Sequence, residues 1–286
     1  MIRLESGPSM VEIDPALGGS IVSARWHGMD IMRPMQGDNV LGASSFPLVP
    51  YSNRIAGSVF SWRGEEVSLK PNHPGDPASP AIHGVGWTSE WKVIDLQPAS
   101  TRLELEHTAN VDWPWSFVAR QDFVLADRGL HLSLSLEHAD DSAMPAGLGF
   151  HPFFPRSSHT LYRGLHRGEW ETDAGCIPTR LRSVPAPQDW WQGRPVETRI
   201  VDTVYTEREG PLTIEWPERG IGLMMVPSDD LAFTTVYVPT GEDFFCVEPV
   251  THMTDAFNRD LPDSGTRLLE AGESWSVDLK LEYFRL

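Results

Sequence analysis

The segment His131–Glu137, HLSLSLE, alternates apolar and polar side chains without a break. In an extended chain, Leu132, Leu134 and Leu136 fall on one face and the polar side chains between them fall on the other. This period of two is typical of half-buried strands in antiparallel sheets. The same alternation recurs in Arg102–Glu106, Leu212–Trp216 and Val277–Tyr283.

Turn residues separate these stretches, and no long segment has the period of an amphipathic helix. The chain of 286 residues contains 24 glycines and 24 prolines, which punctuate the alternating stretches. We therefore predict an all-β protein, one large antiparallel β-sandwich in which residues 1–286 form a single domain. Two stretches are expected to be irregular: the proline-rich loop Pro71–Pro80, and Cys176–Pro195, which we expect to cross the surface or a cleft rim.

Charge and cysteine content limit the partners of the protein. The formal net charge of −17 argues against binding to nucleic acid or to an anionic membrane. The first residues lack an apolar signal core, and no apolar run approaches the roughly 20 residues of a membrane-spanning helix. The two cysteines, Cys176 and Cys246, provide no disulfide framework. We expect a cytoplasmic monomer or homodimer that binds neither nucleic acid nor membrane.

An acidic residue interrupts an apolar run near the C-terminus. The run Phe244–Val247 predicts a buried strand, and it is followed by Glu248 and Pro249, which is expected to end that strand. Phe244, Cys246 and Glu248 would share one face. A buried carboxylate is costly unless it is paired or used. Glu248 is therefore either a general base whose pKa burial raises, or a structural carboxylate that caps a loop or pairs with an arginine.

The segment PAGLGFHPFF places His151 among aromatic residues, with Pro152 directly after it. Burial in such surroundings is expected to lower the pKa of the imidazole unless an acid stabilises its charge. His151 is therefore a candidate catalytic acid or base. The alternative is a core histidine that is hydrogen-bonded to a backbone carbonyl.

Three further places carry polar residues that could contact a ligand. The pair Asn53–Arg54 enters a predicted strand, His83 is followed by Gly84 in AIHGVGW, and Asp202 interrupts the apolar run RIVDTVY. An arginine can offer a fork of donors to hydroxyl or carboxylate groups, and glycines allow a ligand to approach the backbone closely. Each residue also has an ordinary alternative: a surface ion pair for Arg54, an exposed loop position for His83, and a turn for Asp202.

The histidines do not have the spacing of a metal site. No HxH or HxxxH pattern joins His83 or His151 to Glu248, and a proline lies between Glu248 and His252. Phosphate-binding loops and the GxSxG motif of serine hydrolases are absent from the sequence. We expect neither a metal nor a cofactor.

In their order along the chain, these segments together resemble the aldose 1-epimerase (galactose mutarotase) family over nearly the whole sequence. The ending EPVTHMTDAFN resembles a bacterial subgroup of undefined substrate within it. The matching motifs are Leu17–Ile21 (LGGSI), Asn53–Arg54 with the following Gly57–Phe60, Ile82–Gly84 (IHG), Gly149–Phe154 (GFHPFF), Asp202, and Glu248–Pro249. HPFF and the Glu-Pro pair are specific when they occur together, and Asp202 is the weakest match. Phe153 and Ile82 stand where many members have tyrosine and leucine.

The resemblance implies a β-sandwich whose cleft binds a free monosaccharide and interconverts its α and β anomers. Glu248 would be the base that takes the anomeric proton, and His151 the acid that protonates the ring oxygen. Arg54, His83 and Asp202, assisted by Asn53, would bind the remaining hydroxyl groups. The divergent segment Cys176–Pro195 leaves the identity of the sugar open.

Three alternatives remain at the level of sequence. A hexose-6-phosphate mutarotase would need more basic side chains at the cleft, for which the candidates are Arg156, Arg180, Arg182 and Arg194. A non-catalytic sugar-binding protein could keep the same fold. An assembly or interaction protein would expose a large apolar patch in place of a polar cleft.

Overall fold

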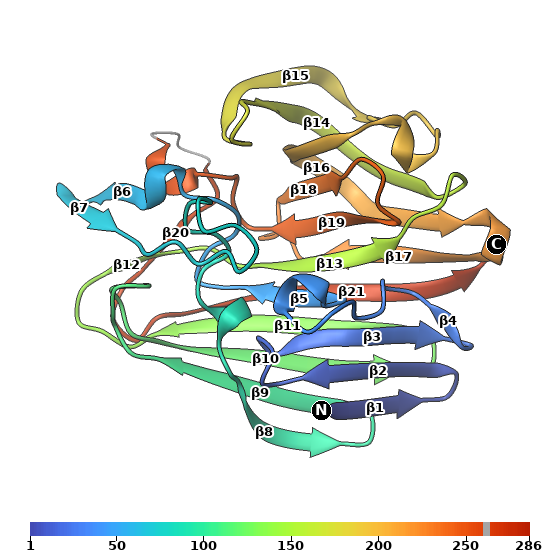
Figure 1. Cartoon of the computed structure of the whole chain (residues 1–286), viewed down its shortest axis with the longest axis horizontal. Helices are drawn as coiled ribbons and strands as arrows, with labels where there is room; N and C mark the ends of the chain where they lie inside the picture. The colour runs from blue at the N-terminus through green and yellow to red at the C-terminus, as the bar shows by residue number, and fades with distance from the viewer. Residues whose placement is uncertain (260–263) are drawn as a thin grey trace.

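The computed structural model describes residues 1–259 and 264–286, and regular structure in these ranges is almost entirely β-strand (Figure 1). The predicted all-β class is confirmed. The six helical segments that are described are single 3-10 turns: Val40–Gly42, Ala56–Ser58, Gly86–Thr88, Val196–Thr198, Pro217–Arg219 and Ala256–Asn258.

One layer of the sandwich is an antiparallel sheet that joins the first strands of the chain to later ones. Its strands, in the order in which they pair, are β1 (Ile2–Ser6), β2 (Ser9–Asp14), β3 (Ser20–Trp26), β5 (Ser45–Leu48), β13 (Gly149–Pro155), β19 (Phe244–Val250), β18 (Phe233–Val238) and the first part of β16 (Val201–Trp216). The short β4 (Met29–Asp30) pairs with the end of β3.

The second layer is also antiparallel, and its strands overlap those of the first layer in the view of Figure 1. In pairing order they are β8 (Lys92–Gln97), β9 (Ser100–His107), β10 (Phe117–Ala126), β11 (Gly129–His138), β21 (Ser274–Arg285), β17 (Ile221–Pro227) and the last part of β16. The long strand β16 therefore joins the two layers, because its first residues pair with β18 and its last residues pair with β17.

The remaining strands extend the sheets or form small hairpins. The strand β14 (Leu161–Thr172) pairs with β16 on one side and with β15 (Pro178–Asp189) on the other. The other two pairs are β6 (Val59–Trp62) with β7 (Glu65–Ser68), and β12 (Met144–Ala146) with β20 (Arg267–Leu269).

The core lies between the two layers and contains the alternating leucines. Leu132, Leu134 and Leu136 of β11 are buried, and they lie opposite apolar residues of β21, Leu134 with Val277 and Leu132 with Leu279. At roughly 25 cal/mol per Å² of apolar surface, burial of each such side chain contributes about 1.5–3 kcal/mol before the entropy of ordering the chain is subtracted. The predicted face of this strand is confirmed.

The prediction that Cys176–Pro195 is irregular was wrong, although its side chains are mostly exposed, as expected for a segment on the surface. This segment contains β15, which pairs with β14, and β14 is the one strand of the described residues that pairs with it over several residues. Edge strands tolerate proline because one row of their N–H groups faces away from the sheet, and Pro185 and Pro187 lie in this strand. Its mostly exposed side chains also lack the alternation that marks half-buried strands. The other segment expected to be irregular, Pro71–Pro80, is a loop as predicted.

Pro249 does not end β19. The strand continues to Val250, which lies opposite Gly149 of β13 and Phe233 of β18. Neighbouring strands on both sides hold the backbone extended, so tertiary pairing overrides the local effect of the missing N–H.

No helix in the described part of the chain is long and apolar enough to cross a membrane.

Candidate active site

Strand register lines up the polar residues of the candidate site on one face of the first sheet. In the pairing of β13 with β19, Phe153 lies opposite Cys246, and the same register sets His151 opposite Glu248. Residues directly opposite one another in antiparallel strands project from the same face. Two rows therefore cross the sheet. One contains Phe46, His151, Glu248, Thr235 and Val204, and the other contains Phe153, Cys246, Tyr237 and Asp202.

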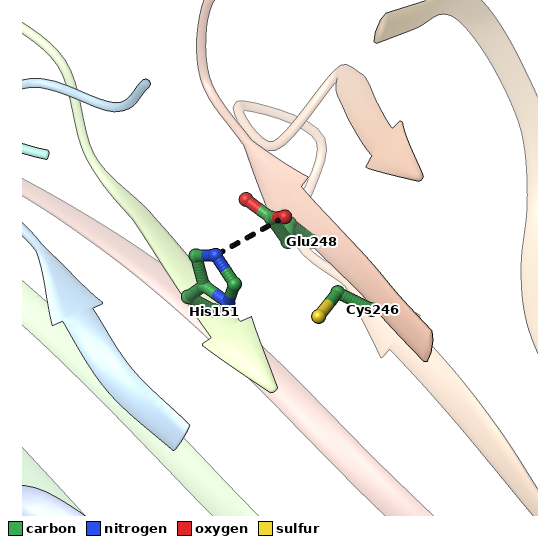
Figure 2. Close-up of side chains that lie close together, drawn as sticks. All are labelled: His151, Cys246 and Glu248. Atoms are coloured by element: carbon green, nitrogen blue, oxygen red, sulfur yellow. Dashed lines mark ion pairs between the residues drawn. The ribbon is translucent and has the colours of Figure 1, made fainter. Parts of the chain in front are cut away.

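His151 and Glu248 point toward each other from adjacent strands (Figure 2). His151 Nε2 lies 3.3 Å from Glu248 Oε1, and both side chains are almost completely buried. The second carboxylate oxygen, Oε2, is buried without a hydrogen-bond partner among the described residues. Most buried polar atoms have a hydrogen-bond partner, so this oxygen is free to accept a hydrogen bond from a ligand.

Aromatic rings enclose the imidazole of His151. The ring of Phe153 is stacked on it at 4.7 Å between centroids, and the ring of Phe46 lies at 4.4 Å. His83 meets it edge-on at 5.0 Å. These contacts fix the ring orientation and exclude water from it.

Burial moves the pKa values of the two facing groups in opposite directions. Burial, reinforced by the charge of Asp202, raises the pKa of Glu248 well above its usual range, although Arg54 opposes the shift. Burial also lowers the pKa of His151 to about 3. Desolvation disfavours the charged form of each group, so the pair favours one proton held on the carboxyl beside a neutral imidazole.

A cavity of about 250 Å³ opens over these rows, and all six residues predicted from the sequence line it. They come from loops as well as strands: Asn53, Arg54, His83, His151, Asp202 and Glu248. The structure therefore brings these residues together, and their individual roles remain predictions.

Two hydrogen bonds join the loop residues His83 and Asn53. Both residues adopt positive φ, His83 at 61° and Asn53 at 60°. The Asn53 N–H donates to His83 Nδ1 at 3.1 Å, and the His83 N–H donates to the Asn53 carbonyl at 3.1 Å. Burial holds the pKa of His83 well below its usual range. A neutral ring that accepts at Nδ1 carries its proton on Nε2, so His83 can donate to a ligand.

Arg54 connects the loop that carries Asn53 to Asp202 of β16. Its Nη1 lies 3.3 Å from Asp202 Oδ2 and donates to Asn53 Oδ1 at 3.3 Å. Both side chains of the Arg54–Asp202 pair are about one quarter exposed and line the cavity. They consequently offer charged donors and acceptors for the hydroxyl groups of a ligand.

The segment after Glu248 holds the loop of Asn53 and Arg54 in place. His252 Nε2 accepts from the Ser52 N–H at 3.0 Å, and its Nδ1 donates to the Met253 carbonyl at 2.7 Å. Asp255 Oδ1 accepts from the Ala56 N–H at 2.9 Å, while the Asp255 N–H donates to the Arg54 carbonyl at 3.0 Å. His252 is therefore a structural histidine that fixes the position of the ligand-facing loop.

The sequence reasoning missed several residues that line the cavity. They are mostly apolar or aromatic: Leu41, Phe46, His73, Phe153, Tyr237 and Phe244. Tyr237 and Phe46 reach the cavity because their strands pair in register with β19 and β13. Alternation within each strand was the sequence signal that could have indicated these residues. The pairing of the strands was also needed to tell which face of each strand borders the cavity.

Arg33 supports the aromatic wall from behind. Its guanidinium lies 4.1 Å from the ring centre of Phe153 and 4.5 Å from that of Phe244. Nη2 donates to the carbonyls of Leu41 and Ala43, both at 2.9 Å. Burial lowers the pKa of this arginine. Arg33 thus fixes two rings that face the ligand.

His151 and Glu248, which line the cavity, form with the neighbouring Cys246 a group of side chains that could coordinate a metal ion. The donor atoms of His151, Cys246 and Glu248 lie within 4.8 Å of one another, and all three residues are buried. Figure 2 shows the three side chains converging between β13 and β19.

Comparison with known proteins agrees with this fold. Residues 1–282 match the model of the Aldose 1-epimerase family. The chain is 30% identical to the uncharacterized protein YphB of Escherichia coli (strain K12) over 282 residues, covering 95% of each sequence.

Solved structures with the same fold include two bacterial proteins. The crystal structure of an Escherichia coli K12 protein assigned as an aldose 1-epimerase is 28% identical, with a TM-score of 0.90, covering 99% of this chain and 98% of that one. The galactose mutarotase-like protein from Clostridium acetobutylicum shares the fold at 19% identity and a TM-score of 0.87, covering 99% and 95% of the two chains.

The fold is galactose mutarotase-like. The chain is a member of the aldose 1-epimerase family.

Proposed function

We propose that the protein is a mutarotase that interconverts the α and β anomers of a free, unphosphorylated aldose. The observation that carries this proposal is the contact between His151 and Glu248, 3.3 Å apart at the floor of the cavity. Two facing acid–base groups can serve the two oxygens of a hemiacetal, which share the anomeric carbon. Ring opening must remove a proton from one of these oxygens and deliver a proton to the other.

In the proposed reaction, the Glu248 carboxylate removes the proton of the anomeric hydroxyl. The electrons of that O–H bond form the C1 carbonyl, the bond from C1 to the ring oxygen breaks, and the ring oxygen takes a proton from protonated His151. Rotation about C1–C2 presents the other face of the aldehyde. The reverse transfers then close the ring and restore both groups.

In the ligand-free pair burial favours a carboxylic acid beside a neutral imidazole, so the reaction begins when the Glu248 proton moves to His151 across their 3.3 Å contact. Ring opening converts a carboxylate and an imidazolium into a carboxylic acid and a neutral imidazole. Burial favours these neutral forms, because it raises the pKa of Glu248 and lowers the pKa of His151. The pair carries one proton before and after the step, so no proton has to be exchanged with solvent during the reaction.

The remaining polar groups are positioned to hold the rest of the sugar. His83, Arg54 and Asp202 line the same cavity and offer both donors and an acceptor. Fixing the other hydroxyl groups leaves the C1 end free to rotate. The aromatic side chains of Tyr237 and Phe244 add apolar surface suited to a sugar face.

The charges around the cavity favour a neutral sugar over a sugar phosphate. Among the described residues that line it, Arg54 is the one lysine or arginine, and it is paired with Asp202. The four arginines considered from the sequence, Arg156, Arg180, Arg182 and Arg194, do not line the cavity. A phosphate would also meet the carboxylate of Asp202.

Polarimetry of freshly dissolved α-D-galactose, α-D-glucose and their 6-phosphates tests both parts of the proposal. The protein should accelerate the approach to anomeric equilibrium for at least one free hexose and should act much less on its 6-phosphate. Preference for the phosphate would overturn the substrate class. Saturable binding of free sugar, measured by calorimetry, with no acceleration of any sugar would favour a binding protein.

A further inference from the structure

Cys246 is a buried thiol with no part in the proposed reaction. It is fully buried, forms no disulfide, and lies on the same face of β19 as Glu248, two residues away. Burial and the nearby Glu248 carboxylate raise the pKa of its thiol well above the usual range. For packing alone, a small apolar side chain would serve equally well at this position.

The sulfur does not lie among apolar atoms alone, because it faces the acid–base pair (Figure 2). His151, Cys246 and Glu248 each present one donor atom, and all three atoms fall within 4.8 Å of one another. In a tetrahedral zinc site with ordinary bond lengths, donor atoms are roughly 3.3–3.6 Å apart. Side-chain movements of about 1 Å would therefore close the three donors around one ion.

The chemistry of the donors selects the class of cation. Binding of the cation would release the protons of the Cys246 thiol and the Glu248 carboxyl to solvent. The resulting imidazole, thiolate and carboxylate form a nitrogen, sulfur and oxygen set that suits Zn²⁺ and disfavours Mg²⁺ or Ca²⁺, which prefer oxygen. The two negative ligands would balance the charge of a divalent ion within a buried site. The unpartnered Oε2 of Glu248 supplies a further lone pair at the same place.

We propose that His151, Cys246 and Glu248 bind a thiophilic divalent cation, with Zn²⁺ as the physiological example, and that this ion inhibits the protein. Its fourth ligand position would face the cavity, where a water molecule or a sugar hydroxyl can reach it. A bound cation would occupy the imidazole and carboxylate that move protons. Zn²⁺ should therefore compete with the sugar.

Cobalt(II) provides a probe of the site that does not depend on activity. Coordination of a thiolate to Co²⁺ produces a sulfur-to-metal charge-transfer band in the near ultraviolet. We expect this band in the wild-type protein and in Cys176→Ser, which removes the other cysteine. The band should be absent in Cys246→Ser and Cys246→Ala. Absence of the band in the wild type, or its survival in both Cys246 variants, would overturn the proposal.

Zinc titrations of the same four proteins give the second readout. Equilibrium dialysis against Zn²⁺ should show the ion bound to wild type and Cys176→Ser at least roughly tenfold more tightly than to the Cys246 variants, since loss of one ligand should cost no less than loss of an outer-shell contact. Thermal unfolding will show whether each Cys246 variant is folded. The competition with sugar rests on the proposed function, whereas the Co²⁺ spectrum and the dialysis do not. Equal Zn²⁺ affinity in all four proteins would contradict the site.

Discussion

His151 and Glu248 lie opposite each other on adjacent antiparallel strands, with Nε2 and Oε1 3.3 Å apart. The relationship follows from strand register, so it does not depend on a flexible loop. The middle strands of the sheet place a pair of acid–base groups at the floor of a cavity, and the surrounding loops supply the groups that hold a ligand.

The pH dependence of kcat/KM should reflect a pair that works with one proton. A second proton binds only below the ordinary pKa of histidine, because burial lowers the pKa of His151 to about 3. The single proton leaves only above the ordinary pKa of glutamate, because burial raises the pKa of Glu248 well above it. We expect a plateau that continues through pH 6.5 without an inflection. An inflection at that value would show that an unperturbed histidine controls the rate.

Replacing Asp202 by asparagine should move the alkaline limb of that profile to lower pH. The negative charge of Asp202 contributes to the raised pKa of Glu248, so its removal should lower that pKa. KM should rise as well, because Arg54 loses its charged partner. The exposed Asp95→Asn on β8 serves as the control and should leave the profile unchanged. An unmoved limb in Asp202→Asn would contradict the electrostatic coupling.

Glu248→Gln should stabilise the fold at neutral pH while it removes activity. The folded-state pKa of Glu248 is raised above the unfolded value near 4.5, so the unfolded chain gains stability by ionising as the pH increases beyond 4.5. Glutamine does not ionise, so the variant does not lose folding stability in this way as the pH increases. The Tm difference between variant and wild type should therefore grow from pH 4 to pH 8. Glu66→Gln, at an exposed position, is the control and should show no such trend. If the Tm difference between Glu248→Gln and wild type did not depend on pH, Glu248 would not be held neutral in the fold.

His252→Leu should weaken the loop that carries Asn53 and Arg54. The substitution keeps an apolar body of similar size but leaves the buried Ser52 N–H without its acceptor, at a cost of about 1–3 kcal/mol. Denaturant unfolding should show this loss of stability. Sugar binding should weaken more than the turnover rate falls, because the loop holds hydroxyl-binding groups and not the proton-transfer pair. An unchanged KM in His252→Leu would show that the position of this loop does not affect ligand binding.

Much of the fold could be predicted from alternation, and the exceptions have physical reasons. The leucines of HLSLSLE alternate because one face of β11 is buried and the other is not. β8 and β15 have almost no buried side chains, so they leave no period of two in the sequence. The prolines of β15 indicate a loop when neighbouring strands are unknown, yet they are compatible with the edge of a sheet.

The candidate site could be assembled from short motifs only in part. His151 and Glu248 stood out because polar groups interrupted apolar runs. Asn53, Arg54, His83 and Asp202 were candidates with ordinary alternatives, and resemblance to a family favoured ligand binding for them. Phe46 and Tyr237 are ordinary alternating aromatic residues in the sequence. Their place beside the pair depends on long-range strand pairing, which a local pattern does not contain.

The central claim is that Glu248 and His151 together transfer the protons of anomer interconversion. Its most direct test is polarimetry of α-D-galactose and α-D-glucose with wild type, Glu248→Gln and His151→Asn under identical conditions. Loss of either group should reduce kcat by about 10²–10⁴-fold while the fold, judged by its thermal unfolding, is retained. Wild-type rates in either variant would contradict the claim.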